Sequence, residues 1–570
     1  MSAMKKILYT IILSVCCTLS FSSCSDLLDE ESKTEVAKKN YMKNAAEAEN
    51  VLLGVYRNMV TDAMYGYNMS ILFNLATDIA QVEGSTNENF RIIPTNSFPT
   101  TQAEVQQTWK TLYNSIYNAN DFMEGLEQKA GNYSDGDKVL ARIYMAEARG
   151  LRALYYFELV RRYGNVALMS TTQMSQQPPA TFEQADPAKV YEFIEEDLKF
   201  AIDNLPYAAD DTYRVNKEFR FSKGSALGLL AKVYATWAGY PVKDESKWEA
   251  AARTAKVLIE SGKHGLLSDF EQLWKNSGSS TWDATESLLE VSFYTPTTTG
   301  GASDPCGRIG KWNGVKTTVI AGKRGSCAGN VKVVHTFVLD WRKNEGDLRR
   351  DISIANYLYN PGKTLYAKGK NDSEETAAAA DLDPEKKQKE KQNYTPAKWD
   401  IEKYVPQSNA LINNDKSNVN WYLLRYADVL LIYAEAVNEW KKAPDAEAYT
   451  AVNMVRRRGY GKPVTAADKA VDLPEGLSYE SFREAIHKER AYELAFEGHR
   501  RLDLIRWGVY YETVKETSVA LGQWWTSDGS PNYAAATPGY TTKGKHELYP
   551  IPQRDMDLCK KFIQNPGWEK

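Results

Sequence analysis

The chain has 570 residues and a formal net charge of −4 at pH 7. This charge balance excludes a basic protein that binds along the phosphate backbone of nucleic acid, so nucleic acid is not an expected partner. Aromatic residues make up 12% of the chain, with 14 Trp and 35 Tyr, and such rings either pack in a core or stack on the apolar faces of sugars. The length fits several ordinary domains or one large repeat assembly.

Residues 1–23 have the pattern of a secretory signal peptide. Two lysines precede an apolar run over 7–19, which is shorter than the roughly 20 residues that cross a bilayer. The run ends in small residues and Cys24, as in the lipobox of bacterial lipoproteins, although Phe21 stands where that motif usually has Leu. We therefore expect Cys24 to carry lipid and 24–39 to form a lipidated tether. The alternative is an ordinary signal peptide followed by a chance cysteine.

Helical periodicity recurs along the chain, often in pairs of segments. Apolar spacing and capping residues predict helices over 45–61, 105–127, 139–163, 187–204, 222–238, 246–261, 422–440, 446–458 and 479–506. Small residues such as Ala251 and Ala255 lie where paired helices would touch. The spacing of about 34 to 45 residues is typical of tetratricopeptide-type repeats, so we predict a mainly α fold of helix hairpins. An unrelated helical domain is the alternative. Trp109 and Trp237 lie on helical stripes, so we expect them in the core.

Three stretches lack helical periodicity: 62–100, 276–330 and 360–420. Long irregular segments in a folded chain are usually functional or disordered. Cys306 and Cys327 both lie in the second stretch, and an exported chain permits a disulfide between them. Two unbridged thiols are the alternative.

No catalytic motif is present. The sequence has no H-E-x-x-H, G-x-S-x-G, P-loop or G-x-G-x-x-G pattern, and we expect neither a cofactor nor a metal. A glycosidase is not excluded, because its two carboxylates meet only through tertiary geometry. Glu489, Glu493 and Glu497 repeat down one helical face before Arg500 and Arg501. We expect this pattern to be structural, either as a salt-bridged surface helix or as a buried ion network.

Four stretches resemble the SusD/RagB family of surface glycan-binding lipoproteins. They are ARGLRALYYFELV at 148–160 with YGNV at 163–166, LRYADVLL at 424–431, ERAYELAFEGHRRLDLIRW at 489–507, and LYPIP at 548–552 with QNPGW at 564–568. With the lipobox they span nearly the whole chain. One departure is Ala167, where the family often has Pro.

The resemblance implies one SusD-like domain over 40–570, with helical repeats at about 105–262 and 422–508 and ligand-loop insertions at about 62–100 and 276–420. It implies a non-catalytic protein that is lipid-anchored on the extracellular face of the outer membrane. Such a protein captures an oligosaccharide and acts as a lid on a SusC-type TonB-dependent transporter. The length and the overall sequence resemble those of fructan (levan) members of the family. A surface glycosidase and a peptide-binding member remain alternatives.

A sugar presents hydroxyl groups and apolar C–H faces, so its binder needs a ring platform and planar polar side chains. The two irregular insertions supply such residues. Our glycan-binding candidates are Tyr65, Tyr67, Asp78, Asn89, Arg308, Trp312 and Asn313. A bridge between Cys306 and Cys327 would stiffen the second insertion and pre-order it for binding.

Overall fold

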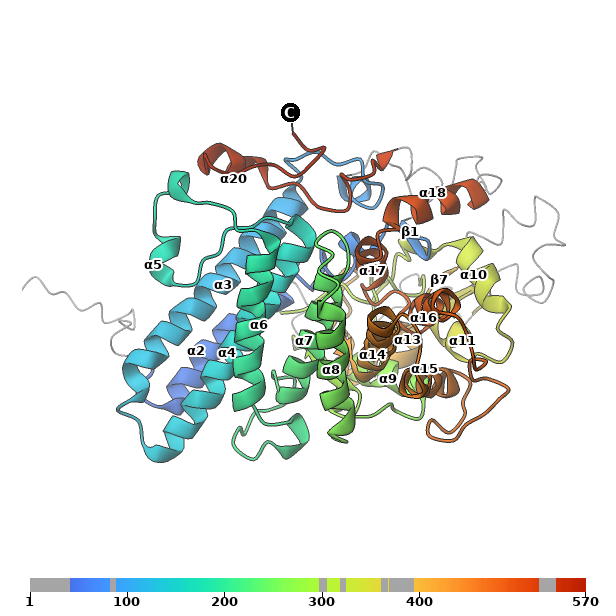
Figure 1. The fold of residues 1–570 in the computed structure, drawn as a ribbon, viewed down its shortest axis with the longest axis horizontal. Helices are drawn as coiled ribbons and strands as arrows, with labels where there is room; N and C mark the ends of the chain where they lie inside the picture. The colour runs from blue at the N-terminus through green and yellow to red at the C-terminus, as the bar shows by residue number, and fades with distance from the viewer. Residues whose placement is uncertain are drawn as a thin grey trace, which may run out of the picture.

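The computed structural model of the chain describes residues 41–82, 89–296, 305–317, 324–359, 367–368, 394–521 and 540–569. Helices make up most of these residues and the strands are short, which confirms the mainly α fold (Figure 1). The signal peptide, Cys24 and the tether lie outside the described residues, so lipid attachment stays a prediction.

The long helices pack side by side in an array (Figure 1). In chain order they are α2 (Ala45–Tyr56), α3 (Ala103–Ala130), α4 (Asp135–Tyr163), α6 (Pro187–Asn204), α7 (Lys223–Ala238), α8 (Lys247–Glu260), α14 (Tyr426–Lys441), α15 (Ala446–Gly459) and α16 (Tyr479–Glu493). From α3 to α8 each long helix packs against the next, and α8 packs against α14. This last contact joins the two blocks of repeats across the insertion that separates them in the sequence.

Small residues allow these helices to approach closely. A Cβ atom added at Gly150 of α4 would lie 2.5 Å from Phe221 Cε1, and one added at Gly228 of α7 would lie 2.8 Å from Leu424 Cδ2. Both distances are too short for carbon atoms in contact, so a larger residue at either position would force the facing side chain to move. Trp109 and Trp237 are each 3% exposed, which confirms their predicted place in the core.

Two predicted helices are interrupted. Residues 421–425 form strand β8 (Trp421–Arg425), because they pair antiparallel with β2 (Ser287–Val291) before α14 begins. The segment predicted as one helix over 479–506 is two helices, because Phe496 (φ 68°) and Gly498 (φ 84°) adopt left-handed conformations that an α-helix does not continue. The chain resumes as α17 (Arg500–Arg506).

Short elements fill the insertions. Strand β1 (Ala80–Val82) pairs with β3 (Val331–Val333), so the two predicted ligand-loop insertions are joined in one structure. The other paired strands are β4 (Ile354–Ala355) with β7 (Thr395–Pro396), and β5 (Tyr357–Leu358) with β6 (Ala367–Lys368). The short helices are α5 (Thr172–Ser175), α9 (Phe270–Ser279), α10 (His335–Arg342), α11 (Arg349–Ser353), α13 (Ile401–Tyr404), α18 (Tyr510–Leu521) and α20 (Gln553–Leu558).

The acidic repeat at the end of α16 belongs to a buried ion network. Glu493 accepts hydrogen bonds from Arg458 at 2.6 Å, from Arg425 at 3.0 Å and from Arg349 at 3.1 Å. Burial acts to raise the pKa of Glu493, but these three arginines outweigh it and lower the pKa to about 2. The network therefore ties α16 to β8, α15 and α11, which resolves the two structural alternatives in favour of the buried one.

Candidate functional site

Three of the predicted site residues meet in one cluster. The Arg308 guanidinium lies 4.6 Å from the centre of the Tyr67 ring and 5.6 Å from that of Trp312. The two rings are 4.9 Å apart and meet edge to face. We call Tyr67, Arg308 and Trp312 the aromatic platform.

Backbone hydrogen bonds build this platform. The Arg308 amide donates to the Gly66 carbonyl at 2.8 Å, which places Arg308 beside Tyr67. The Trp312 amide donates to the Arg308 carbonyl at 3.1 Å, so one helical turn brings both side chains to the same side. Gly66 is required there, because a Cβ at that position would lie 2.7 Å from the Thr61 carbonyl oxygen.

Two carboxylates fix the arginine in place. Asp62 accepts a hydrogen bond from Arg308 at 2.8 Å, and Asp415 accepts another at 2.8 Å. Asp415 also accepts the indole N–H of Trp312, and Lys416 donates to Asp62 at 2.7 Å. Burial acts to raise the pKa of Asp62, but the hydrogen bonds from Arg308 and Lys416 outweigh it and lower the pKa. The platform is thus a hydrogen-bonded and partly buried unit in which Asp62 is ionised.

Solvent reaches this unit from one side. The Arg308 side chain is 22% exposed and that of Asp415 is 43% exposed, and Trp312 is half-buried. Tyr67 is only 8% exposed, and its hydroxyl has no hydrogen-bond partner among the described residues. On the adjoining segment Tyr294 is 65% exposed. Parts of a planar cation and of the two carboxylates that hold it are therefore open to solvent beside the half-buried Trp312 ring.

The adjoining segments are held together by their backbones. Gly307 and Ser417 exchange two hydrogen bonds at 3.0 and 2.7 Å, and Thr295 donates its amide to the Asn418 side chain at 2.9 Å. Tyr294, Asp62 and Asp415 were not among the predicted site residues. The contacts of Asp62 and Asp415 with Arg308 depend on pairings between distant segments, which no local pattern of the sequence encodes.

Three other candidates do not join the aromatic platform. Tyr65 is 2% exposed and donates its hydroxyl to Glu158 at 2.7 Å, so it belongs to the core. Asp78 accepts a hydrogen bond at 2.8 Å from Arg500 in an ion pair. Asn313 is buried and accepts the Gly310 amide at 2.8 Å, which closes a turn. These side chains serve the fold of the insertions.

Asn89 begins the short 3₁₀ helix Asn89–Ile92, but its side chain lies outside the described residues. Its predicted role in binding is therefore still only a prediction.

The predicted disulfide was wrong. Within the described chain Cys306 and Cys327 are both buried and are not bridged. The backbone beside each cysteine has a different partner. Gly307, next to Cys306, pairs with Ser417, whereas Cys327 pairs with Thr317. Burial raises the pKa of the Cys327 thiol to about 11, so this thiol stays protonated and unreactive near neutral pH.

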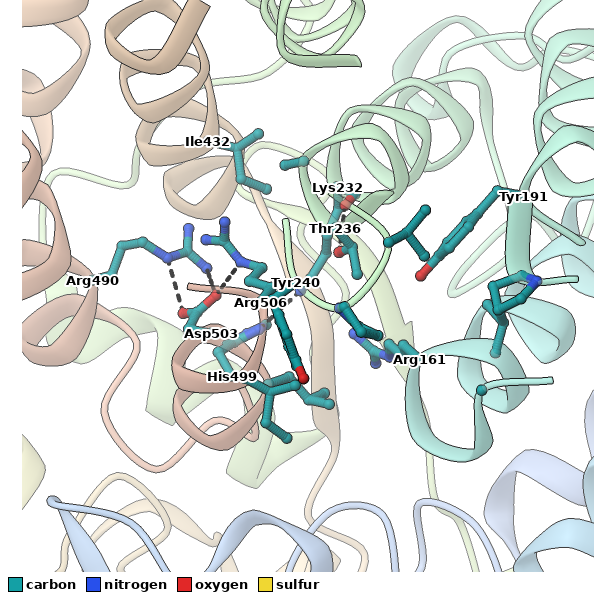
Figure 2. Close-up of a pocket in the computed structure, with 18 residues that line it drawn as sticks. Arg161, Tyr191, Lys232, Thr236, Tyr240, Ile432, Arg490, His499, Asp503 and Arg506 are labelled. Carbon is teal, nitrogen blue, oxygen red and sulfur yellow. Dashed lines mark hydrogen bonds and ion pairs between the residues drawn. The ribbon is translucent and has the colours of Figure 1, made fainter. Parts of the chain in front are cut away.

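Figure 2 shows another gathering of charged side chains, in a pocket between α4, α6, α7, α14, α16 and α17. Arg490 and Arg506 each donate to Asp503 at 2.9 Å, and Lys232 Nζ lies 2.9 Å from Nδ1 of His499. Burial lowers the pKa of His499 to about 3, so the ring is neutral. The volume is about 30 Å³, which holds no more than one or two waters. This pocket is too small for a sugar ring, and its charges stabilise the helix array.

The described ranges hold neither a membrane-spanning helix nor a metal cluster. None of their helices is both long and apolar enough to cross a bilayer. They bring no three His, Cys, Asp or Glu side chains together in a way that could hold a metal ion.

An array of helix hairpins that carries large insertions defines the class of protein. Two family models match: one described as "SusD family" over residues 311–568, and one described as "Starch-binding associating with outer membrane" over residues 26–235. A crystal structure of a SusD homolog from Bacteroides thetaiotaomicron VPI-5482 is 68% identical, with a TM-score of 0.89, and the match covers 95% of this chain and 100% of that one. The chain belongs to the SusD/RagB family.

More distant relatives match over nearly the full length. SusD-like protein P25 of Formosa agariphila is 24% identical, over 97% of this chain and 98% of the relative. A solved structure named as a laminarin binding SusD-like protein is 24% identical with a TM-score of 0.64, and covers 92% of this chain and 100% of that one.

Proposed function

We propose that this protein is a cell-surface glycan-binding lipoprotein and that the aromatic platform holds the sugar. The observation that carries the proposal is the Arg308 guanidinium fixed over Tyr67 and beside Trp312 by two carboxylates. The part of the Trp312 ring that is open to solvent would stack on the C–H face of a sugar ring. Arg308 and Asp415 would hydrogen-bond to its hydroxyl groups.

The same geometry argues for binding without hydrolysis. A glycosidase needs one carboxylic acid that stays protonated and donates a proton to the leaving oxygen. The pKa of Asp62 is lowered by Arg308 and Lys416, and Asp415 is ion-paired with Arg308 at 2.7 Å. Asp62 therefore suits hydrogen-bond acceptance and not proton donation, and Asp415 is already engaged as an acceptor by Arg308 and Trp312.

The proposed setting follows from family membership and the N-terminal pattern. Cys24 would carry lipid on the outer face of the outer membrane, and residues 24–39 would tether the body. The body would act as a lid that delivers oligosaccharide to a SusC-type TonB-dependent transporter. The description "Starch-binding associating with outer membrane" for the family model over 26–235 supports this setting. Fructan is our expected glycan class, on overall resemblance alone.

Isothermal titration of the purified protein tests the proposal. The probes are oligosaccharides from levan, laminarin and starch, with a mixed peptide library as the alternative ligand. Saturable binding of a glycan with no new reducing ends supports the proposal. New reducing ends would make the protein a glycosidase, and binding to peptides alone would assign it to peptide uptake.

A further inference from the structure

A second cavity lies on the far side of helix α3 from the aromatic platform. It has a volume of about 480 Å³ and is enclosed by α3, the segment 167–182 and α20 with the turn that follows it. Ligand pockets in proteins occupy roughly 300–1,000 Å³, so this cavity, which we call the α3 cleft, is large enough for a sugar unit or two.

The geometry of helix α3 separates the aromatic platform from the α3 cleft. Thr108 and Ser115 face the segment that precedes the platform, because Thr108 donates to the Ala63 carbonyl at 2.6 Å and Ser115 accepts from Asn58 at 3.0 Å. Tyr113 and Tyr117 line the α3 cleft. At about 100° per residue these two pairs point to nearly opposite sides of the helix. A ligand in the cleft therefore touches none of the platform residues.

Aromatic rings form the floor of the α3 cleft. Trp109 and Tyr113 meet edge to face at 4.9 Å, and the Tyr113 hydroxyl donates to the Ala167 carbonyl at 3.1 Å. Tyr113, Tyr117 and Phe182 are each half-buried, so their rings are partly open to a ligand. Rings held in this way lose little freedom when they bind.

Polar side chains with unused hydrogen-bonding capacity surround these rings. Gln107, Lys110, Asn114 and Arg554 are exposed at the rim. In the described part of the chain neither Lys110 nor Arg554 forms an ion pair, whereas exposed lysines elsewhere, such as Lys256 with Glu447, often do. Amide, ammonium and guanidinium groups around a ring floor match the hydroxyl groups and C–H faces of a sugar.

We propose that the α3 cleft is a second saccharide-binding site, independent of the aromatic platform. The proposal rests on the proposed function as a glycan binder. Two sites on opposite sides of one helix would let a long glycan, or two chains, be held at once, and this raises overall retention without new contacts at either site.

The test removes each site in turn and titrates the same levan, laminarin and starch oligosaccharides. Trp312→Ala weakens the platform. Asn114→Trp fills the α3 cleft, and Gln128→Trp on the exposed part of the same helix is its matched control. We expect Trp312→Ala to leave residual binding that falls at least about tenfold when Asn114→Trp is added, with no fall for Gln128→Trp.

The outcomes separate the two proposals. Loss of all binding in Trp312→Ala, or residual binding that Asn114→Trp leaves unchanged, would overturn the second site and leave the platform standing. Binding that responds to Asn114→Trp alone would support the cleft and contradict the platform. Absence of glycan binding by the wild-type protein would overturn both. The milder pair Gln107→Ala and Asn114→Ala removes only exposed groups, so it should leave the thermal unfolding midpoint unchanged, and a loss of affinity with an unchanged midpoint supports the cleft.

Discussion

Arg308 is stacked over Tyr67 at 4.6 Å, and a hydrogen bond from the Arg308 amide to Gly66 sets this distance. The contact joins the two irregular insertions into one surface. Asp62 and Asp415 each accept a hydrogen bond from the guanidinium, so the platform holds one cation between two carboxylates.

The first prediction concerns the shape of that cation. Arg308→Lys keeps the positive charge but loses the planar fork that reaches both carboxylates and stacks on the ring. We expect glycan affinity to fall by about 5- to 20-fold, with little change in the free energy of unfolding. Titration calorimetry measures the fall. Arg253→Lys is the matched control, because Arg253 lies 5.6 Å from the exposed Trp440 ring, away from the platform. An equal loss in both variants would argue against a specific role for Arg308.

The second prediction concerns membrane attachment. Cys24→Ala removes the thiol that would be acylated, so the protein should leave the outer-membrane fraction and appear in the medium or periplasm. Detergent phase partition of cell fractions measures this change. Cys559→Ala, at a buried thiol of the folded body, should stay with the membrane. Membrane retention of Cys24→Ala in cells that lack the transporter would contradict the lipid anchor.

The third prediction concerns pH. Burial raises the pKa of Glu290 to about 7, although hydrogen bonds from Asn420 and Ser287 act against it. The unfolded chain loses this proton near its ordinary value of 4.5, so stability should fall as the pH rises from about 4.5 to about 7 and then level off. Glu290→Gln cannot ionise. The free energy of unfolding of Glu290→Gln, measured relative to the wild-type protein, should therefore be about 1–3 kcal/mol higher at pH 8 than at pH 4.5.

Urea unfolding of the wild-type protein and Glu290→Gln across this pH range measures the difference. Other groups titrate in both proteins and cancel in the comparison. A difference in the free energy of unfolding that does not change with pH would show that Glu290 is already ionised in the fold.

The fourth prediction concerns the buried ion network. Glu493→Gln leaves Arg349, Arg425 and Arg458 without their shared carboxylate and should destabilise the fold by about 3–5 kcal/mol. Glu249→Gln breaks an exposed pair with Arg253 and should cost less than about 1 kcal/mol. Thermal unfolding compares the two. Similar costs would mean that the network contributes no more than a surface pair.

The pKa of Glu493 also fixes the direction of acid sensitivity. Because the folded pKa is lowered from 4.5 to about 2, the stabilisation is complete above about pH 4.5 and is lost as the pH falls toward 2. Glu493→Gln should therefore differ least from the wild-type protein at low pH.

Much of the fold could be predicted because helices leave local signals. Periodicity located the array, and motifs such as ARGLRALYYFELV pointed to the family. The break after Glu493 was missed, since a strongly helical charge pattern continues past it, although Gly498 was a signal. Strand β8 was missed because its pairing partner, β2, lies far away in the sequence.

The candidate site was only partly predictable for the same reason. Composition selected Tyr65 and Tyr67 together, but one ring lies in the core and the other lies against Arg308. No local feature of the sequence distinguishes two tyrosines that are separated by a single glycine in a turn. The roles of Asp62 and Asp415 depend on the tertiary position of Arg308, which the sequence alone does not locate.

The affinity of Trp312→Ala for the oligosaccharide that binds the wild-type protein tests the central claim most directly. Trp440→Ala is the matched control, because Trp440 is 39% exposed on α14, outside the platform. Loss of a stacked ring at the centre of a site typically costs about 2 kcal/mol or more, so we predict a fall of at least about tenfold for Trp312→Ala and no change for Trp440→Ala. Unchanged affinity in Trp312→Ala would contradict the platform as the glycan-binding site.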